Sequence, residues 1–144
     1  MSTRGMIAIE LPNDEYKAVY THWDSYPQHH GVILLKHYKD RKKVEKLIRM
    51  GSICVLGFDI GKKHDFDSVD ANYSKNGCTF FRRDGGQKGV SAIRYKNVKE
   101  LIKNASFCWA CYVYIFGLDN KWRWFSMYGD KKLSLKLLTK KDCK

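Results

Sequence analysis

The feature that most constrains the fold is a strongly apolar run near the end of the chain, Cys-Tyr-Val-Tyr-Ile-Phe at residues 111–116. Aromatic and β-branched side chains favour the pleated surface of a sheet, so this run predicts a strand. The Gly, Asp and Asn of residues 117–120 predict a turn, and the alternating residues 121–127 predict the returning strand. An isolated hairpin is only marginally stable in water, so this one has to belong to a larger sheet with a buried face.

Alternating apolar and polar residues, bounded by turn-forming residues, predict further strands. These strands are expected at residues 6–11, 16–22, 53–56, 78–82, 90–95 and 133–138. A turn cluster at residues 12–15 joins the first two into a hairpin. The glycine-rich residues 83–89 are expected to join the strands at 78–82 and 90–95 into another. Because hairpins pair strands antiparallel, we expect a mostly antiparallel sheet of about six strands.

Helical patterns occupy three segments. Residues 31–38 contain no breaker after the glycine and predict a short helix. Residues 41–50 place apolar side chains three and four apart on one face, with Asp40 as the N-cap and Gly51 just past the end. Residues 97–104 begin with a capping box, in which Asn is followed three residues later by Glu.

The chain has 144 residues, 44% of them hydrophobic, which is the size and composition of a single globular domain. We therefore expect one α+β domain at residues 1–139, with two to three short helices on one face of the sheet. The lysine-rich residues 140–144 are expected to fray. Neither a membrane-length apolar run nor a signal peptide is found, so we expect a cytoplasmic protein with no membrane partner.

The most unusual segment is residues 21–31, Thr-His-Trp-Asp-Ser-Tyr-Pro-Gln-His-His-Gly, which mixes bulky aromatic residues with polar ones. On an extended chain His22 and Asp24 flank Trp23 and face the same side. Such a pair can orient an imidazole for proton transfer or for holding a phosphate. A structural role accounts for the same residues, with Asp24 capping a turn while Trp23 and Tyr26 pack beneath it. The segment is thus either a functional site or a turn that the fold depends on.

The net charge is +12, from 27 Lys and Arg against 15 Asp and Glu. A charge of this size predicts attraction to polyanions such as nucleic acid or nucleotides, although a solvated lysine surface would produce it too. Alternate side chains of residues 121–127 are expected to form a basic, aromatic surface suited to bases. Basic residues in loops and at strand ends are the candidates for converging on one anion. They are Arg4, Lys62, Lys63, His64, Arg82, Arg83 and Lys88.

No complete catalytic motif is present: the sequence lacks a P-loop, a nucleophile elbow and a zinc-protease helix. If Met1 is removed, Ser2 becomes the N-terminal residue, and its hydroxyl is a candidate nucleophile with the α-amine as base. A small hydrolase or transferase that uses Ser2, or His22 with Asp24, is therefore the alternative to a binding protein.

Five cysteines, an odd number in a chain without a secretion signal, predict free thiols. Cys108 and Cys111 form a single CxxC pair, for which Cys54, Cys78 or a histidine could complete a zinc site. Burial beside a strand explains the cysteines equally well. We therefore expect no metal and no cofactor.

Several of these segments together resemble a family of small proteins of bacteriophages and prophages. The resemblance rests on the Met-Ser-Thr-Arg start with Ile-Ala-Ile after it, on His-Trp-Asp-Ser-Tyr-Pro at residues 22–27, and on the Gly, Leu-Leu and His-Tyr of residues 31–38. It continues through residues 61–67 and 78–84 and thins after Gly89. The chain departs from the pattern at Gly5 and Ser25, where the family often has Ser and Gly.

The resemblance implies an accessory phage protein in the host cytoplasm, where such proteins often counter host defence. The expected partner is a host defence effector, the nucleic acid of that effector, or a signalling nucleotide. Inhibition by binding is expected rather than catalysis, because no catalytic set is complete. The aromatic hairpin at residues 121–127 is also a possible dimer surface, which leaves the oligomeric state open.

Overall fold

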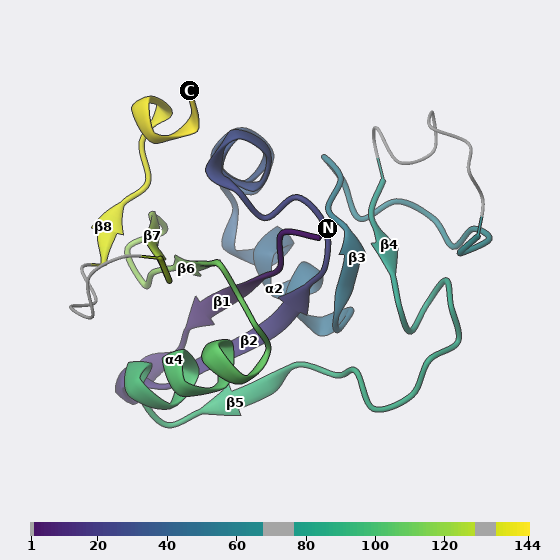
Figure 1. Cartoon of the computed structure of the whole chain (residues 1–144), viewed down its shortest axis with the longest axis horizontal. Helices are drawn as coiled ribbons and strands as arrows, with labels where there is room; N and C mark the ends of the chain where they lie inside the picture. The colour runs from purple at the N-terminus through teal and green to yellow at the C-terminus, as the bar shows by residue number, and fades with distance from the viewer. Residues whose placement is uncertain (1, 68–76, 129–134) are drawn as a thin grey trace.

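The computed structural model describes residues 2–67, 77–128 and 135–144, and these residues form one mixed β-sheet with helices on both of its faces (Figure 1). The strands are β1 (Gly5–Glu10), β2 (Tyr16–Thr21), β3 (Ile53–Val55), β4 (Thr79–Phe80), β5 (Ile93–Tyr95), β6 (Tyr112–Phe116), β7 (Trp122–Ser126) and β8 (Lys136–Leu137). The helices are α1 (Val32–His37), α2 (Arg41–Arg49) and α4 (Val98–Phe107), with short turns η1 (Pro12–Asp14), η2 (Pro27–Gly31) and η3 (Lys140–Cys143). None of these helices has both the length and the apolar composition that a membrane crossing requires.

The sheet has the strand order β4-β3-β2-β1-β6-β7-β8. β1 lies at its centre, where Gly5 is opposite Thr21 of antiparallel β2 and opposite Tyr112 of parallel β6. β2 pairs with two further strands, because its last residue, Thr21, is parallel to Ile53 of β3 while its first residues are antiparallel to β5. Within the described residues the sheet is therefore mixed and has eight strands. The predicted α+β class holds, but the prediction of a mostly antiparallel sheet of about six strands is wrong in both respects.

Each face of the sheet has its own hydrophobic core. Ile7 and Ile9 of β1 point into a cluster completed by α1 and α2, whereas Met6 and Ala8 point into a cluster completed by α4. The prediction of helices on one face only is therefore wrong. Its physical reason is visible in β1, whose residues Gly-Met-Ile-Ala-Ile are all buried, as expected for a strand covered on both sides.

The predicted hairpins at residues 6–22 and 111–127 are confirmed, as are the three helices with their capping residues Asp40 and Asn97. The predicted hairpin at residues 78–95 is wrong. Its first strand, β4, pairs with β3, and its second strand, β5, pairs with β2. These pairings join segments distant in sequence, which local turn residues cannot predict.

The basic, aromatic surface predicted for residues 121–127 is not formed, because several of these side chains pack inside the protein. Trp122 is buried in the cluster of α1 and α2, and Phe125 is buried in the cluster of α4. Arg123 makes two hydrogen bonds to the Asp119 carboxylate, at 2.9 and 2.8 Å. Both sets of alternating side chains thus contribute to a core.

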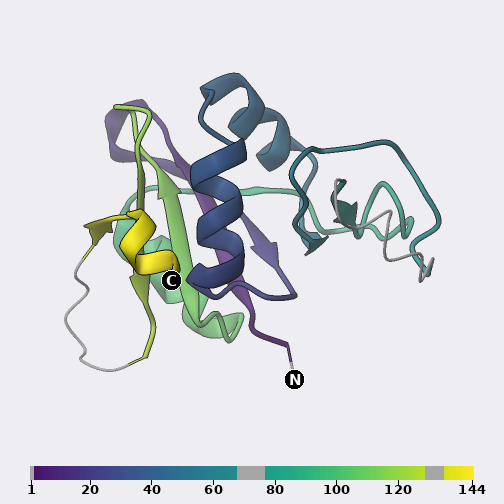
Figure 2. The same cartoon turned by 90° about the horizontal axis from the view of Figure 1, so that it is seen from above.

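The C-terminal residues form the helical turn η3 where a frayed tail is predicted. Thr139 and Asp142 form a capping box, which satisfies the backbone N–H groups at the start of the turn. The Gln28 side chain donates a hydrogen bond to the Lys144 carbonyl at 3.2 Å. Figure 2 shows η3 beside the continuous helical segment of η2 and α1. The tail is therefore attached to the domain by its own capping and by contact with η2.

Candidate functional site

One end of the sheet gathers most of the unusual residues of the chain, where β1 and β6 begin and β2 and β7 end. The Thr3 carbonyl accepts a hydrogen bond from the Ser25 N–H at 3.0 Å. The Arg4 carbonyl accepts one from the Ser25 hydroxyl at 2.8 Å and one from the Cys111 N–H at 2.7 Å. The Cys111 carbonyl in turn accepts from the N–H of Met127 at 2.7 Å. Three loops are thereby held against the N-terminal segment.

The structure separates His22 from Asp24, so the expected pair is not formed. Asp24 adopts a left-handed backbone conformation with φ of 61°, which ends the alternation of an extended chain. His22 is instead hydrogen-bonded through Nδ1 to the Tyr20 hydroxyl at 2.6 Å. The Asp24 carboxylate lies near Tyr26, whose pKa it raises, and near His29. The left-handed turn at Asp24 replaces the extended backbone on which the prediction of a shared side depends.

A buried polar network lies beneath this loop. Thr21 and His30 are fully buried, with Thr21 Oγ1 2.8 Å from His30 Nε2. The Nδ1 atoms of His29 and His30 are 3.0 Å apart, so one ring donates a hydrogen to the other. Burial lowers the pKa of His30 well below its ordinary value, aided by the neighbouring His29. Burial also lowers the pKa of His29, so the environment of both rings favours their neutral forms, with one N–H donated between them.

A second buried link fixes the same loop from below. The Tyr114 hydroxyl donates a hydrogen bond to the Ser25 carbonyl at 2.5 Å, and the Tyr114 ring lies beside His30. Thr21, His29, His30 and Tyr114 are not among the site residues predicted from the sequence. The signal for them is the pair of adjacent histidines after a proline, since two imidazoles at the start of a helix need partners when buried.

On the α4 side, Arg4, Tyr20 and His22 form a half-buried polar row. Register explains it, because Gly5 is opposite Thr21, which puts Arg4 next to His22 and Met6 next to Tyr20. Burial raises the pKa of Tyr20, partly opposed by the Arg4 charge, and burial together with Arg4 lowers the pKa of His22. Arg4 Nε also donates to the Ser2 hydroxyl at 3.3 Å. The row is a polar surface of one net positive charge when His22 is neutral.

Four large aromatic side chains are exposed at this end of the sheet, and we call them the aromatic edge: Trp23 (40% exposed), Phe107 (73%), Trp109 (76%) and Tyr128 (65%). Tyr128 is attached to the loop before β6, because its hydroxyl contacts Cys111 Sγ at 2.9 Å. Trp23 packs edge-on against His22, with ring centroids 4.9 Å apart. Of these four residues, only Trp23 is among the site residues predicted from the sequence.

Trp109 occupies the position after α4 that usually holds glycine. Its φ of 60° is left-handed, its N–H bonds the Ser106 carbonyl at 3.1 Å, and the Ala110 N–H bonds the Ala105 carbonyl at 2.9 Å. These two bonds define a Schellman motif, whose left-handed residue favours glycine because it has no Cβ. A tryptophan stands there, with most of its side chain in solvent.

A row of exposed lysines leads to the aromatic edge. Lys99, Lys103 and Phe107 are spaced four residues apart on α4, and all three are exposed. Side chains four apart lie on the same face of a helix. The solvent face of α4 therefore presents two ammonium groups in line with the aromatic side chains at its end.

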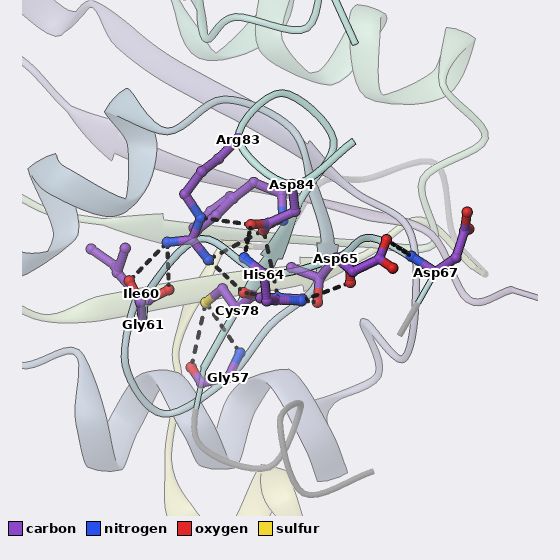
Figure 3. Close-up of polar contacts among 11 residues, drawn as sticks. Gly57, Ile60, Gly61, His64, Asp65, Asp67, Cys78, Arg83 and Asp84 are labelled. Carbon is purple, nitrogen blue, oxygen red and sulfur yellow. Dashed lines mark hydrogen bonds and ion pairs between the residues drawn. The ribbon is translucent and has the colours of Figure 1, made fainter. Parts of the chain in front are cut away.

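The basic residues predicted to converge on an anion do not form one site. Arg83 is used inside the protein, as Figure 3 shows. Its five N–H groups bond the Asp84 carboxylate and the carbonyls of Ile60, Gly61 and Cys78, at 2.8 to 3.2 Å. The Asp84 side chain is fully buried and also accepts from the N–H groups of His64 and Phe80. Arg83 therefore has no donor left for an anion.

The other members of the predicted set are spread over separate loops. The His64 ring contacts the Cys78 carbonyl, the Thr79 hydroxyl and the Asp84 carboxylate, at 3.3, 3.2 and 3.6 Å from its Nε2 atom. Arg82 donates to the Arg49 carbonyl at 2.7 Å, at the end of α2. Lys62, Lys63 and Lys88 are exposed. His64, Arg82 and Arg83 thus bind loops to the sheet.

No zinc site is formed by the cysteine pair within residues 2–67, 77–128 and 135–144, where no group of three or more His, Cys, Asp or Glu side chains is arranged to hold a metal ion. All five cysteines are free thiols, and Cys54 and Cys78 are buried. Cys78 packs under the Tyr38 hydroxyl at 3.5 Å and accepts from the Gly57 N–H at 3.2 Å.

Comparison of the chain with known protein families, with curated proteins and with solved structures finds no match. The residues and their geometry are therefore the basis for a function.

Proposed function

We propose that this chain is a non-catalytic binding protein that holds single-stranded nucleic acid at the aromatic edge, and that it acts as a phage accessory protein against a nucleic-acid-guided host defence. The observation that carries the proposal is Trp109, which is 76% exposed in a left-handed conformation. The phage setting comes from the sequence resemblance, and the ligand class comes from the chemistry of the aromatic edge.

Trp109 contributes little to folding in this position. A left-handed conformation costs an L-residue about 1–2 kcal/mol, and an exposed side chain recovers little of that by burial. Glycine would complete the same Schellman motif without the strain. Strain of this kind is characteristic of functional positions. Stacking of a base on an aromatic side chain contributes about 1–3 kcal/mol, which is enough to account for a tryptophan here.

The charges near the aromatic edge suit a phosphate backbone. Lys99 and Lys103 lead along α4 to Phe107, and Arg4 lies in the polar row between the aromatic loops. From Lys99 to Phe107 the helix rises about 12 Å. Aromatic side chains for bases beside cations for phosphates are the usual composition of a surface for single strands. In a duplex the faces of the bases are stacked on one another and cannot lie on exposed aromatic side chains. The aromatic edge therefore favours a single strand as the ligand.

The geometry supports binding over catalysis. His22 Nδ1 is occupied by the Tyr20 hydroxyl, Asp24 lies in a left-handed turn, and Ser2 accepts a hydrogen bond from Arg4. A general base has to reach the proton that it removes, and no such pair is assembled from these residues.

The direct test is fluorescence anisotropy with a labelled oligothymidylate at several salt concentrations. We expect binding that weakens between about 50 and 200 mM salt, with a log–log slope reduced by about 0.7 in a Lys103→Gln variant. Trp109→Ala should weaken binding about tenfold or more, and Lys42→Gln, at an exposed position on α2 on the opposite face of the sheet from α4, is the matched control for Lys103→Gln. Equal affinity of wild type and Trp109→Ala, or no binding at low salt, would contradict the proposal.

The biological part has its own test. Expression of the chain in a bacterium with a nucleic-acid-guided defence should restore phage plaque formation, and Trp109→Ala should abolish that effect. Restoration that survives Trp109→Ala would assign the anti-defence role to another surface. Co-purification of a defence protein without nucleic acid would favour a protein partner over the proposed strand.

A further inference from the structure

On the opposite face from α4, a hollow of about 430 Å³ lies between α1 and η3. It is lined by Val32, Leu35, Lys36, Lys39, Lys140 and Cys143. Val32, Leu35 and Lys36 are spaced at i, i+3 and i+4 and so lie on one face of α1, and Lys39 follows two residues after the end of the helix. The other two come from η3, which Figure 2 shows beside this helix. A hollow of this volume is within the range of small-molecule sites.

The floor of the hollow is apolar and is built before any ligand binds. Val32 is 39% exposed, and Leu35 and Cys143 are half-buried. A Cβ atom on Gly31 would lie 2.8 Å from Cys143 Sγ, so the absence of a side chain there lets η3 approach α1 closely. The capping box of Thr139 and Asp142 then fixes η3 itself. The walls are thus held in place by contacts outside the hollow.

The rim is positively charged and unbalanced. Lys36, Lys39 and Lys140 are exposed, and none of them forms an ion pair with any described residue. The two nearest carboxylates in the sequence are already used, Asp142 by the Thr139 N–H and hydroxyl at 2.9 Å and Asp40 by the Lys42 N–H at 3.4 Å. An anion in the hollow would therefore meet three ammonium groups and no carboxylate in the lining, with the Asp142 carboxylate next to Cys143 as the nearest negative charge.

We infer that the hollow is a second ligand site, which binds a small organic phosphate. The phosphate lies among Lys36, Lys39 and Lys140, and the apolar body of the ligand lies on Val32, Leu35 and Cys143. Lysine is a common phosphate ligand because its ammonium is a compact point charge with three donors. The lining offers no amide, carboxylate or aromatic ring, so it selects for charge and apolar volume. Nucleoside monophosphates and alkyl phosphates share this chemistry.

Cys143 provides the readout, because a ligand on the floor would cover its thiol. Alkylation of the full chain with iodoacetamide, followed by peptide mass spectrometry, measures the rate at Cys143 and, as an internal control, at Cys111. We expect AMP or hexyl phosphate to slow the reaction of Cys143 about tenfold or more at saturation. Hexyl phosphate, which has no base to stack on the aromatic edge, should leave Cys111 unchanged. Which of the two probes protects better identifies a nucleotide or a lipid-like ligand.

The variants separate this site from the aromatic edge. Lys36→Gln with Lys39→Gln and Lys140→Gln should remove the protection, whereas Lys99→Gln with Lys103→Gln should leave it intact. All five lysines are exposed, so both variants should keep the wild-type circular dichroism spectrum. Absence of protection by either probe, or protection that persists without the three rim lysines, would overturn the inference. Equal protection by inorganic phosphate would overturn the role of the apolar floor.

Discussion

Gly5 and Ser25 fit against each other where β1 begins, since a Cβ atom on Gly5 would lie 2.6 Å from the Cβ of Ser25 and 2.9 Å from the Tyr112 carbonyl oxygen. Ser25 is fully buried, and its hydroxyl donates to the Arg4 carbonyl. The absence of a side chain at Gly5 therefore leaves the space that the Ser25 side chain occupies.

This relationship predicts non-additive stability. Gly5→Ser should destabilise the fold by about 1–3 kcal/mol through overpacking, and Ser25→Gly by about 1–2 kcal/mol through the lost hydrogen bond and the added freedom of the unfolded chain. In the double variant the loss should be smaller than the sum, because the space left by one change receives the other. Urea unfolding of the four proteins measures the cycle. Additive losses of unfolding free energy would show that the side chains at positions 5 and 25 do not compete for the same space.

Trp109→Gly should separate stability from binding. Glycine relieves the left-handed strain, so the free energy of unfolding should rise by about 1 kcal/mol while affinity for single strands falls. Trp109→Ala is the matched control, because alanine loses the ring but keeps the strain. Thermal unfolding and anisotropy on the same three proteins make the comparison. Lower stability of Trp109→Gly than of Trp109→Ala would show that the ring stabilises the fold.

Arg83 should tolerate no conservative replacement. Lysine keeps the charge but cannot reproduce five N–H donors in a planar fork, so Arg83→Lys should cost about 1–3 kcal/mol and Arg83→Ala about 3–5 kcal/mol. Arg82→Lys, at the neighbouring exposed position, should cost less than about 1 kcal/mol and is the control. Chemical denaturation measures all three. A neutral Arg83→Lys would mean that the guanidinium is not required to hold the loop of Ile60 and Gly61.

Asp84 makes the same network sensitive to acid. Burial alone would raise the pKa of its carboxyl, but hydrogen bonds from Arg83 and from the N–H groups of Phe80 and His64 bring that pKa below its usual value. A carboxyl with a lower pKa in the folded chain stabilises the fold above the unfolded pKa of about 3.9, and this stability is lost as the pH falls through the folded pKa. We expect Asp84→Asn to be less stable at neutral pH and to lose part of the acid-dependent slope. An unchanged slope would exclude Asp84 as its source.

The histidine pair should add a second pH dependence at milder acidity. The pKa values of His29 and His30 are lowered by burial, so below about pH 6.5 the unfolded chain binds protons that the folded chain does not. Linkage then requires stability to fall as the pH drops from that value towards the folded pKa values. Unfolding free energies between about pH 5 and 7.5 measure the slope. His30→Asn should flatten it, and an unchanged slope in that variant would exclude His30 as its source.

How much of the fold could be predicted from the sequence depends on how far apart along the chain the interacting residues lie. The capping residues Asp40 and Asn97 were predictable because each cap acts within its own turn. The partners of β4 and β5 were not, because the local turn at residues 83–89 favours a hairpin and only the packed sheet selects β3 and β2 instead. The all-apolar β1 did carry a sign of burial on both faces.

The candidate site residues likewise divide into those with a local sequence signal and those that depend on distant contacts. Arg83 in a glycine-rich loop has the composition of an anion site. Only the positions of the Ile60, Gly61 and Cys78 carbonyls, together with the adjacent Asp84 carboxylate, reveal that its donors are occupied. Trp109 carried no local signal, since its left-handed conformation becomes visible only with the end of α4. Lys36, Lys39 and Lys140 meet because the C-terminal turn packs on α1, which no local pattern predicts.

The central pairing of β1 with β6 also sets an order for synthesis. Gly5 pairs with Tyr112, so the first strand leaves the ribosome long before its parallel neighbour exists. Until then the hairpin of β1 and β2 presents one unpaired edge of an almost wholly apolar strand, which is a template for aggregation. We expect a nascent chain that ends before residue 112 to associate with chaperones, and release to coincide with the emergence of β6.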